Sequence, residues 1–256
     1  MTATDPSTPL AGQVALVTGG SRGLGLEMAT AFAEAGADIV IASRKLDACE
    51  RAAAAITEAT GRRALPVAVH VGHWDELDRL ADAAYDAYGR VDVLVNNAGM
   101  SPLYPSLAAV TEDLFDKVIG VNLKGPFRLS AVVGERMKKA GRGSIINVSS
   151  VAAVRPSDRE LIYAAAKAGL HALTAGFAQA LGPEVRVNTL MAGPFLTDIS
   201  KAWDMDEFER RAKNYPMQRA GQPHEVVGAA LYFATDVSRF TTGSLLAVDG
   251  GMAVSR

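Results

Sequence analysis

Cysteine and long apolar runs are scarce in this sequence of 256 residues, and each absence excludes a class of protein. A single cysteine, Cys49, rules out an intrachain disulfide framework and a cysteine-rich metal site. No apolar run approaches the roughly 18 residues that a membrane-spanning helix needs. No Lys or Arg precedes Arg22, so the positive start of a secretory signal is absent. We therefore expect a cytoplasmic globular protein with no membrane partner.

An excess of charge of either sign is also missing. The 26 basic and 28 acidic residues leave a net charge of −2. Because a nucleic-acid partner requires a basic face, we expect none. Apolar residues are abundant instead: they make up 49% of the chain, which is enough for a large core and too much for a disordered protein.

Short apolar runs alternate with helical patterns along most of the chain. Strand-length runs are predicted at Val14–Val17, Asp38–Ser43, Ala64–His70, Val91–Val95, Ser144–Val148, Val185–Leu190 and Leu245–Val248. Helical patterns are predicted at Leu24–Ala35, Leu46–Thr60, Trp74–Tyr88, Thr111–Lys139 with a bend near Gly125-Pro126, Glu160–Leu181 and Pro223–Thr235. Fully apolar strands that each lead into a helix predict an α/β fold, a doubly wound parallel sheet of about seven strands with helices on both faces.

No linker or repeat divides this pattern, so residues 13–256 are predicted to form one domain. Residues 1–12, which are rich in Thr and Pro, are expected to be a flexible lead-in. The segment Phe195–Arg219 fits neither period and is interpreted as a substrate-loop insertion with helical pieces that covers a ligand. Cys49 lies within a predicted helix and is assigned to packing.

A glycine-rich turn follows the first predicted strand, with the sequence Thr18-Gly19-Gly20-Ser21-Arg22-Gly23-Leu24-Gly25. Glycines permit a tight turn and the close approach of a ligand, and the free N–H groups where the next helix begins face an anion such as a pyrophosphate. The G-x-x-x-G-x-G spacing differs from the commonest dinucleotide-binding fingerprint. In isolation it could be only a tight connection, but its place after the first strand favours nucleotide binding.

Tyr163 and Lys167 lie four residues apart on a predicted helix and therefore share one face. An ammonium group near a phenol is expected to lower the pKa of the phenol. Such a tyrosine can give a proton to a carbonyl oxygen during reduction and take it back during oxidation. A surface pair on an amphipathic helix is the alternative, and the alanines between the two residues favour a close-packed site.

Three motifs together resemble the signatures of the classical short-chain dehydrogenases/reductases in order and spacing: Thr18-Gly19-x-x-x-Gly23-x-Gly25, Asn96-Asn97-Ala98-Gly99 and Tyr163-x-x-x-Lys167. The resemblance extends from about residue 12 to Val248-Asp249-Gly250-Gly251, which is nearly the whole chain. It implies a Rossmann-type fold and hydride transfer between a nicotinamide cofactor and a carbonyl or alcohol carbon.

The resemblance also implies a catalytic set of Asn122, Ser150, Tyr163 and Lys167. Tyr163 would be the general acid/base, and Ser150, thirteen residues earlier, would orient the substrate oxygen. Lys167 would also bind the nicotinamide ribose, and Asn122 would hold a water that connects Lys167 to solvent. Ser149 would be a neighbour or cap. The alternative for Asn122 is a polar residue at a helix irregularity.

Cofactor-binding positions are implied along the same edge of the sheet. They are Gly19, Ser21, Arg22, Gly23, Leu24, Gly25, Ser43, Arg44, His70, Val71, Asn96, Ala98, Gly99, Tyr163, Lys167, Gly193 and Thr197. Asn97 is expected to brace the sheet, and Asp92 to support it. The chain departs from the family at Ala192, where a Pro is usual, and at His70, where an Asp is usual.

The end of the second strand indicates which nicotinamide cofactor binds. Ser43 stands where NAD-dependent members carry an Asp, and Arg44 follows it. Together with Arg22, Arg44 could bracket a 2′-phosphate through charge-assisted hydrogen bonds, so NADP(H) is predicted over NAD(H). The alternative is a pair of ordinary surface arginines.

Two histidines lie at and just after the end of the third predicted strand. His70 could bond the adenine edge as a neutral acceptor. No carboxylate or cysteine accompanies His70 and His73 at ligand spacing, so no metal site is predicted.

These observations predict an NADP(H)-dependent carbonyl reductase, with 3-oxoacyl thioesters, sugar-derived ketones and small carbonyls as candidate substrates. An NAD-dependent alcohol or sugar dehydrogenase and a non-catalytic NADP(H) sensor remain as alternatives. The substrate pocket is expected from Met100–Pro105, Val151–Arg159 and Phe195–Arg219, with Leu103, Tyr104, Phe195 and Trp203 apolar and with Arg155 and Lys201 able to meet a carboxylate or phosphate. The resemblance implies a homotetramer built on Thr111–Lys139 and Glu160–Leu181, with a dimer as the alternative.

Overall fold

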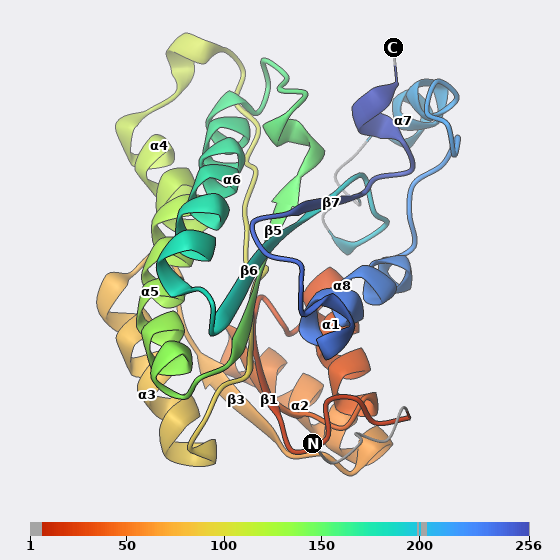
Figure 1. The fold of residues 1–256 in the computed structure, drawn as a ribbon. Coiled ribbons are helices and arrows are strands. Elements are labelled where there is room, and N and C mark those ends of the chain that lie inside the picture. The colour runs from red at the N-terminus through yellow and green to blue at the C-terminus, as the bar shows by residue number, and fades with distance from the viewer. Residues whose placement is uncertain (1–6, 199, 201–203, 256) are drawn as a thin grey trace.

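The seven strands of this protein form one parallel sheet, seen in a computed structural model that describes residues 7–198, 200 and 204–255 (Figure 1). The order across the sheet is β3-β2-β1-β4-β5-β6-β7. The strands are β1 (Val14–Thr18), β2 (Asp38–Ser43), β3 (Ala64–Ala68), β4 (Val93–Asn96), β5 (Gly143–Ser150), β6 (Val185–Ala192) and β7 (Leu245–Val248). The predicted doubly wound parallel sheet is confirmed.

Helices cover both faces of the sheet, with α3 to α6 on one face and α1, α2 and α8 on the other (Figure 1). Their bounds are α1 (Gly23–Glu34), α2 (Leu46–Thr60), α3 (Trp74–Tyr88), α4 (Glu112–Ile119), α5 (Gly125–Lys139), α6 (Leu161–Leu181), α7 (Met205–Ala212) and α8 (Val227–Ala234). Each face has its own apolar core, one including Phe32 and Phe233 and the other Leu80 and Val133. The strands are apolar throughout because both of their faces are buried.

The bounds of α2 and α3 agree with the prediction because glycine ends both helices. Gly61 and Gly89 adopt left-handed backbone angles, with φ of 67° and 73°. Glycine reaches this conformation without steric penalty, so it ends a helix reliably.

The N-terminal segment differs from the expected flexible lead-in over its described residues. Leu10 is fully buried in the core beside α1, and its N–H donates to the carbonyl of Ala35 at 2.8 Å. The composition of the segment indicated flexibility, but one leucine is enough to dock it. Residues 1–6 lie outside the described part of the chain.

The predicted long helix from Thr111 to Lys139 is interrupted by a π-helical segment, Gly120–Lys124. The irregularity precedes Gly125-Pro126, the bend expected from the sequence. A Cβ on Gly125 would overlap the carbonyl oxygen of Val71, so the backbone of α5 packs directly on the loop after β3. The π-helical segment contains Asn122, which it buries completely.

The segment Phe195–Arg219 includes the helix α7, in keeping with the helical pieces expected there. Its two ends are anchored near the sheet: Phe195 pairs with Gly221, and Tyr215 is buried. Trp203 and Lys201, expected to line the substrate pocket, lie outside the described residues. The predicted helix from Pro223 begins as a 3₁₀ turn, Pro223–Val226, and continues as α8.

The strand order decides where a ligand can bind. It reverses direction at β1, which pairs with β2 on one side and with β4 on the other. In an open α/β sheet a crevice forms outside the carboxyl ends of the strands at this switch point. In the part of the chain that is described, no helix has the length and apolarity needed to cross a membrane.

Candidate active site

The glycine-rich turn after β1 is shaped by close backbone packing. Gly19 and Gly23 adopt left-handed angles, with φ of 65° and 54°. A Cβ on Gly19 would lie 2.8 Å from Asn97 Nδ2, and one on Gly25 would overlap the carbonyl oxygen of Gly19. Asn97 Nδ2 donates to the carbonyls of Thr18 at 3.0 Å and of Gly19 at 3.3 Å. Asn97 therefore braces the glycine-rich turn and the end of β1, where a bracing role in the sheet was expected.

The turn presents the start of α1 to the crevice. Arg22, the N-cap residue, makes no side-chain cap hydrogen bond, and no acidic residue occupies the first turn of the helix. The N–H groups and partial positive charge of such a helix start suit a phosphate. The side chain of Leu24, in this first turn, packs against the core on the α1 face.

The end of β2 is tied to the same turn, because Ser21 Oγ donates to Ser43 Oγ at 2.9 Å. The guanidinium groups that the sequence analysis singled out are open to solvent here. The side chain of Arg22 is 62% exposed, with Nη1 3.7 Å from a carboxylate oxygen of Asp198, and Arg44 is exposed.

The loop after β3 fixes the tautomer of His70. Its Nδ1 accepts from the N–H of Gly72 at 3.2 Å, and its ring stacks on His73 with centroids 4.3 Å apart. Burial, and secondarily the neighbouring His73, lower the pKa of His70. The neutral ring therefore carries its proton on Nε2. At an adenine edge Nε2 would donate a hydrogen bond, where an acceptor was expected. No three His, Cys, Asp or Glu residues in the described ranges come together as a metal-binding group.

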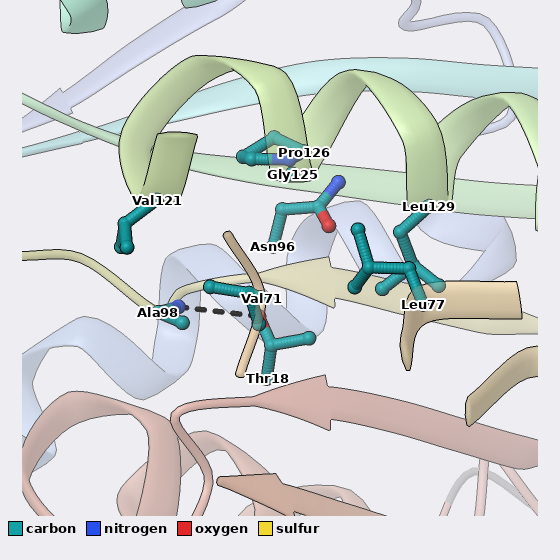
Figure 2. A pocket seen from close by; sticks show the side chains of 9 residues that line it. All are labelled: Thr18, Val71, Leu77, Asn96, Ala98, Val121, Gly125, Pro126 and Leu129. Atoms are coloured by element: carbon teal, nitrogen blue, oxygen red, sulfur yellow. Dashed lines mark hydrogen bonds between the residues drawn. The ribbon is translucent and has the colours of Figure 1, made fainter. Parts of the chain in front are cut away.

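A small hollow lies between the carboxyl ends of β1 and β4 and the helices above them (Figure 2). Val71 and Ala98 line it, and the N–H of Ala98 donates to Thr18 Oγ1 at 3.2 Å. The side chain of Asn96 points toward α5 in Figure 2 and donates to Ser130 Oγ at 2.9 Å and to Asn147 Oδ1 at 2.8 Å. Since these bonds hold the Asn96 amide inside the sheet, its side chain has a structural role.

Ser150 and Tyr163 are brought together where β5 meets α6. Ser150 is the last residue of β5, and its Oγ accepts from the N–H of Ala152 at 3.2 Å. It also hydrogen-bonds the phenol of Tyr163. Ser149 is buried and bonds His171 Nε2 at 2.7 Å, on the other side of the strand end. Of the two adjacent serines, Ser150 is therefore the one beside Tyr163, and it also supplies the cap that had been considered for Ser149.

Lys167 lies behind Tyr163 on α6. Its Nζ is 5.7 Å from the centroid of the Tyr163 ring and donates to the carbonyl of Val148 at 2.8 Å. Lys167 is only 3% exposed, and burial lowers its pKa to about 8.

The pKa of Tyr163 differs from the expectation. Burial raises it to about 12; the hydrogen bond from Ser150 lowers it, and the charge of Glu160 raises it further. The expected lowering by Lys167 is not seen: Lys167 is not among the groups that shift the pKa of the phenol, and burial outweighs the lowering by Ser150. Tyr163 is thus a neutral phenol at pH 7 and carries its proton.

Asn122 braces the loop that follows β4. Its Nδ2 donates to the carbonyls of Met100 at 2.8 Å and Val118 at 2.9 Å, and its Oδ1 accepts from the N–H of Met100 at 3.3 Å. Both amide hydrogens are therefore used within the protein. A Cβ on Gly99 would lie 3.0 Å from Asn122 Oδ1 and 3.7 Å from Lys167 Nζ, so the backbone of this loop passes close to both residues.

The loop after β6 closes the crevice from the other side. The N–H of Gly193 donates to the carbonyl of Val248 at 3.0 Å, and Ala192 ends β6 in the place of the usual Pro without breaking the strand. A Cβ on Gly23 would lie 3.5 Å from Thr197 Cγ2, so the loop reaches the glycine-rich turn.

Arg155 does not face the site as a partner for a carboxylate. Its Nη1 donates to the carbonyls of Met252 at 2.6 Å and Ser255 at 2.7 Å, and to Ser255 Oγ at 2.7 Å. These partners are about 100 residues away in the chain, so the local sequence carries no sign of them.

Two neighbours of the site were not singled out from the sequence. Glu160 acts on Tyr163 through its charge, and His171 bonds Ser149. The spacing could have identified Glu160, because it precedes Tyr163 by three residues, close to one helical turn. The spacing of His171, four residues after Lys167, is an equally local signal.

The comparisons with known proteins agree with this arrangement. The family model described as Enoyl-(Acyl carrier protein) reductase matches residues 19–253. An L-rhamnose 1-dehydrogenase (NAD(P)(+)) from Azotobacter vinelandii is 37% identical over 94% of this chain and 96% of its own. A 3-oxoacyl-(acyl-carrier-protein) reductase from Chlamydia trachomatis is 38% identical over 95% of this chain and 98% of its own.

A solved structure supports the same relationship. It is a protein from Beutenbergia cavernae, provisionally described as an NAD(P)-dependent gluconate 5-dehydrogenase with bound NADP at low occupancy. It superposes with a TM-score of 0.92 and 31% identity, over 97% of this chain and all of the other. With its motifs, its Rossmann-type sheet and its relatives in agreement, the chain belongs to the classical short-chain dehydrogenase/reductase family of oxidoreductases.

Proposed function

We propose that this protein is an NADP(H)-dependent oxidoreductase that interconverts a ketone or aldehyde and an alcohol, working as a carbonyl reductase. The observation that carries the proposal is the convergence of Ser150, Tyr163 and Lys167 at the carboxyl edge of the sheet. A phenol that is neutral at pH 7 suits the reductive direction, in which the substrate oxygen gains a proton.

The protein's own residues manage the proton and the substrate oxygen. Bound nicotinamide supplies or accepts the hydride. During reduction Tyr163 gives its proton to the carbonyl oxygen, while the hydroxyl of Ser150 holds that oxygen in place. Lys167, the one ammonium placed behind the phenol, stabilises the phenolate that remains until a proton returns from solvent. Asn122 holds the backbone of Met100 through two hydrogen bonds. We assign Asn122 to the path by which a proton returns from solvent.

The residues along the crevice fit a dinucleotide. The turn leaves no room for a Cβ at Gly19 or Gly25, and Gly23 has a left-handed φ of 54°. The α1 N-terminus beside the turn suits a pyrophosphate. Lys167 and Thr197 are assigned to the nicotinamide half and the loop at His70 and Val71 to the adenine half. Gly99 and Gly193 are assigned to close backbone contacts.

Arg22 and Arg44 support NADP(H) over NAD(H) in this proposal. Arg44 follows Ser43, where an acidic residue would repel a 2′-phosphate, and Arg22 follows Ser21, whose hydroxyl bonds Ser43. Relatives with NAD(P) in their names and the NADP-bound neighbour support a nicotinamide cofactor in general. NADP(H) is the finer assignment, and it rests on the two arginines.

The substrate is proposed to enter between Met100–Pro105, Val151–Arg159 and the loop Phe195–Arg219. The named activities of the relatives, on L-rhamnose, a 3-oxoacyl thioester and gluconate, all concern an alcohol or carbonyl carbon. The assembly is proposed to be a homotetramer that pairs α4, α5 and α6 with their copies, with a cytoplasmic location.

A panel of carbonyl compounds tests the proposal, with turnover followed as loss of NADPH absorbance. Tyr163→Phe removes the proton donor, so its kcat should fall by about 10²–10⁴-fold. NADPH binding, followed by fluorescence, should persist in this variant. Retained turnover in Tyr163→Phe would refute the assigned acid. Tight NADPH binding with no turnover of any carbonyl by the wild type would instead indicate a cofactor sensor.

A further inference from the structure

Glu160 places a carboxylate beside the catalytic tyrosine, at the side where the substrate would enter. It is the residue before α6 and is partly exposed. Its Oε2 accepts from Ser101 Oγ at 3.3 Å, and its Oε1 from Ser157 Oγ at 3.5 Å. Its charge acts on the phenol of Tyr163. Glu160 therefore belongs to the surroundings of the reacting atoms.

The two loops that carry these serines are held at Glu160. The N–H of Leu161 donates to Tyr104 Oη at 2.7 Å, which fixes the loop after β4 on the start of α6. Ser101 lies on that loop, and Ser157 on the loop after β5. The carboxylate thus lies where the two proposed walls of the substrate pocket meet.

No cation neutralises this carboxylate among the described residues. None of the ion pairs there includes Glu160. Arg155, the nearby arginine expected to meet a carboxylate, is committed to Met252 and Ser255. Within the described ranges, the carboxylate of Glu160 bonds only two hydroxyls, both at long hydrogen-bond distances, so its oxygens can accept further hydrogen bonds.

The side chain has no evident task in holding the helix. Glu160 makes no side-chain cap hydrogen bond to α6, although its main-chain carbonyl accepts from the N–H of Ala164 at 2.9 Å. The carboxylate is therefore committed neither to the helix cap nor, among the described residues, to an ion pair, and its oxygens can accept hydrogen bonds from a ligand.

We propose that Glu160 is a specificity-determining residue that accepts a hydrogen bond from a hydroxyl of a neutral, polyhydroxylated substrate and repels substrates with a carboxylate near the reacting carbon. This inference rests on the proposed oxidoreductase function and narrows its substrate class. A hydroxyl donor gains a charge-assisted bond, and an anion at the same place meets a like charge.

A matched pair of probes tests the assignment in the holoenzyme. One probe is a polyhydroxylated ketone, and the other is the keto acid in which a terminal CH₂OH is replaced by a carboxylate. Each is measured as a substrate and as a competitive inhibitor of whichever carbonyl the enzyme reduces. The wild type should prefer the neutral probe by about tenfold or more. Glu160→Gln should bring this preference close to unity, mainly by improving the acid, whereas Glu160→Asp should retain it.

Asp86→Asn is the control, because it removes the same charge from an exposed position on α3, away from the site. It should leave the preference at the wild-type value. Thermal unfolding of each variant distinguishes an altered fold from an altered site. An unchanged preference in Glu160→Gln, or equal or tighter binding of the acid by the wild type, would overturn the assignment while leaving the oxidoreductase intact. Failure of the wild type to reduce any carbonyl would overturn the proposed function itself.

Discussion

Burial sets the charge of the two central residues of this site. Lys167 is buried and Tyr163 is partly buried, and each is driven toward its neutral form, with a pKa of about 12 for Tyr163 and of about 8 for Lys167. The enclosed ammonium has a consequence for stability as well as for catalysis.

Lys167 should make the stability of the ligand-free protein rise with pH in the alkaline range. The pKa of Lys167 is lowered from 10.5 to about 8 on folding, so between these values the unfolded chain holds one more proton. Raising the pH in that window therefore favours the folded state. Relative to Lys167→Met, the wild type should gain about 2 kcal/mol in free energy of unfolding between pH 7.5 and pH 9.5.

Urea unfolding of the wild type and of Lys167→Met, at the same protein concentration and at both pH values, measures this difference. Arg79→Met, an exposed cation paired with Asp75, serves as the control and should show the pH dependence of the wild type. Parallel curves for the wild type and Lys167→Met would contradict the prediction.

Arg22 and Arg44 should decide between the two nicotinamide cofactors. Arg22, in the glycine-rich turn, and Arg44, just after β2, both have exposed side chains, so replacing them with Ala removes charge without opening the core. The Michaelis constant for NADPH should rise at least tenfold, whereas that for NADH should change little, because only NADPH has a 2′-phosphate. Arg51→Ala, on the exposed side of α2, is the matched control. An equal change for both cofactors would refute the assignment.

The positions of side chains could be predicted from the sequence where local spacing determines them. Ser150, Tyr163 and Lys167 meet as their spacing and the family resemblance implied. Arg155 could not be placed, because its partners Met252 and Ser255 are distant in the chain. The sign of the Tyr163 pKa shift also depends on burial, which the spacing of two residues on a helix does not reveal.

Among the secondary-structure elements, the docked N-terminal segment is the clearest departure from the sequence pattern. Leu10 fills the core beside α1 although its neighbours have the composition of a loop. Leu10→Ala should lower the free energy of unfolding by about 2–5 kcal/mol, as truncation of a buried leucine does elsewhere. Chemical denaturation measures the loss. Leu46→Ala, an exposed leucine at the start of α2, should change stability by no more than about 0.5 kcal/mol. Similar effects of the two changes would show that the segment is not docked.

Element bounds were predictable where glycine ends a helix and less so where tertiary contacts decide. Gly61 and Gly89 marked the ends of α2 and α3 correctly. The π-helical segment between α4 and α5 was not predictable. It directly precedes Gly125, whose backbone packs on the Val71 carbonyl, a contact between residues far apart in the chain. The side chain that it buries, Asn122, was identified only through the family resemblance.

At the scale of the whole molecule, the outer face of α4 to α6 carries exposed apolar side chains. Phe115 is 48% exposed, Phe127 41% and Leu161 45%. If this face is the proposed subunit interface, Phe115→Glu should reduce the tetramer to a smaller species, because an unpaired charge would be buried. Light scattering coupled to size-exclusion chromatography measures the mass. Leu46→Glu, on α2 across the sheet, should leave the mass unchanged. A monomeric wild type would contradict the proposed assembly.

The fold class was predictable because seven apolar runs and the helices between them leave few alternatives. The substrate was not, because the walls of its pocket are arranged by long-range contacts. Two examples are the pairing of Phe195 with Gly221 and the hydrogen bond from the N–H of Leu161 to Tyr104, neither of which a local sequence pattern predicts. Substrate recognition is therefore the property for which the sequence is least informative, and Glu160 is the residue where the structure adds most.

The place of β1 between β2 and β4 has a consequence for the order in which the strands can pair during folding. Leu16 pairs with Val40 on one side and with Leu94 on the other, although Leu94 follows it by more than seventy residues. The second pairing must wait until the chain through β4 has been synthesised. Until then the most buried strand of the sheet has an open edge that another chain could occupy. Parallel pairings over such separations close slowly. During synthesis, protection of the first ninety or so residues should matter more for the yield of folded protein than the final stability of the sheet.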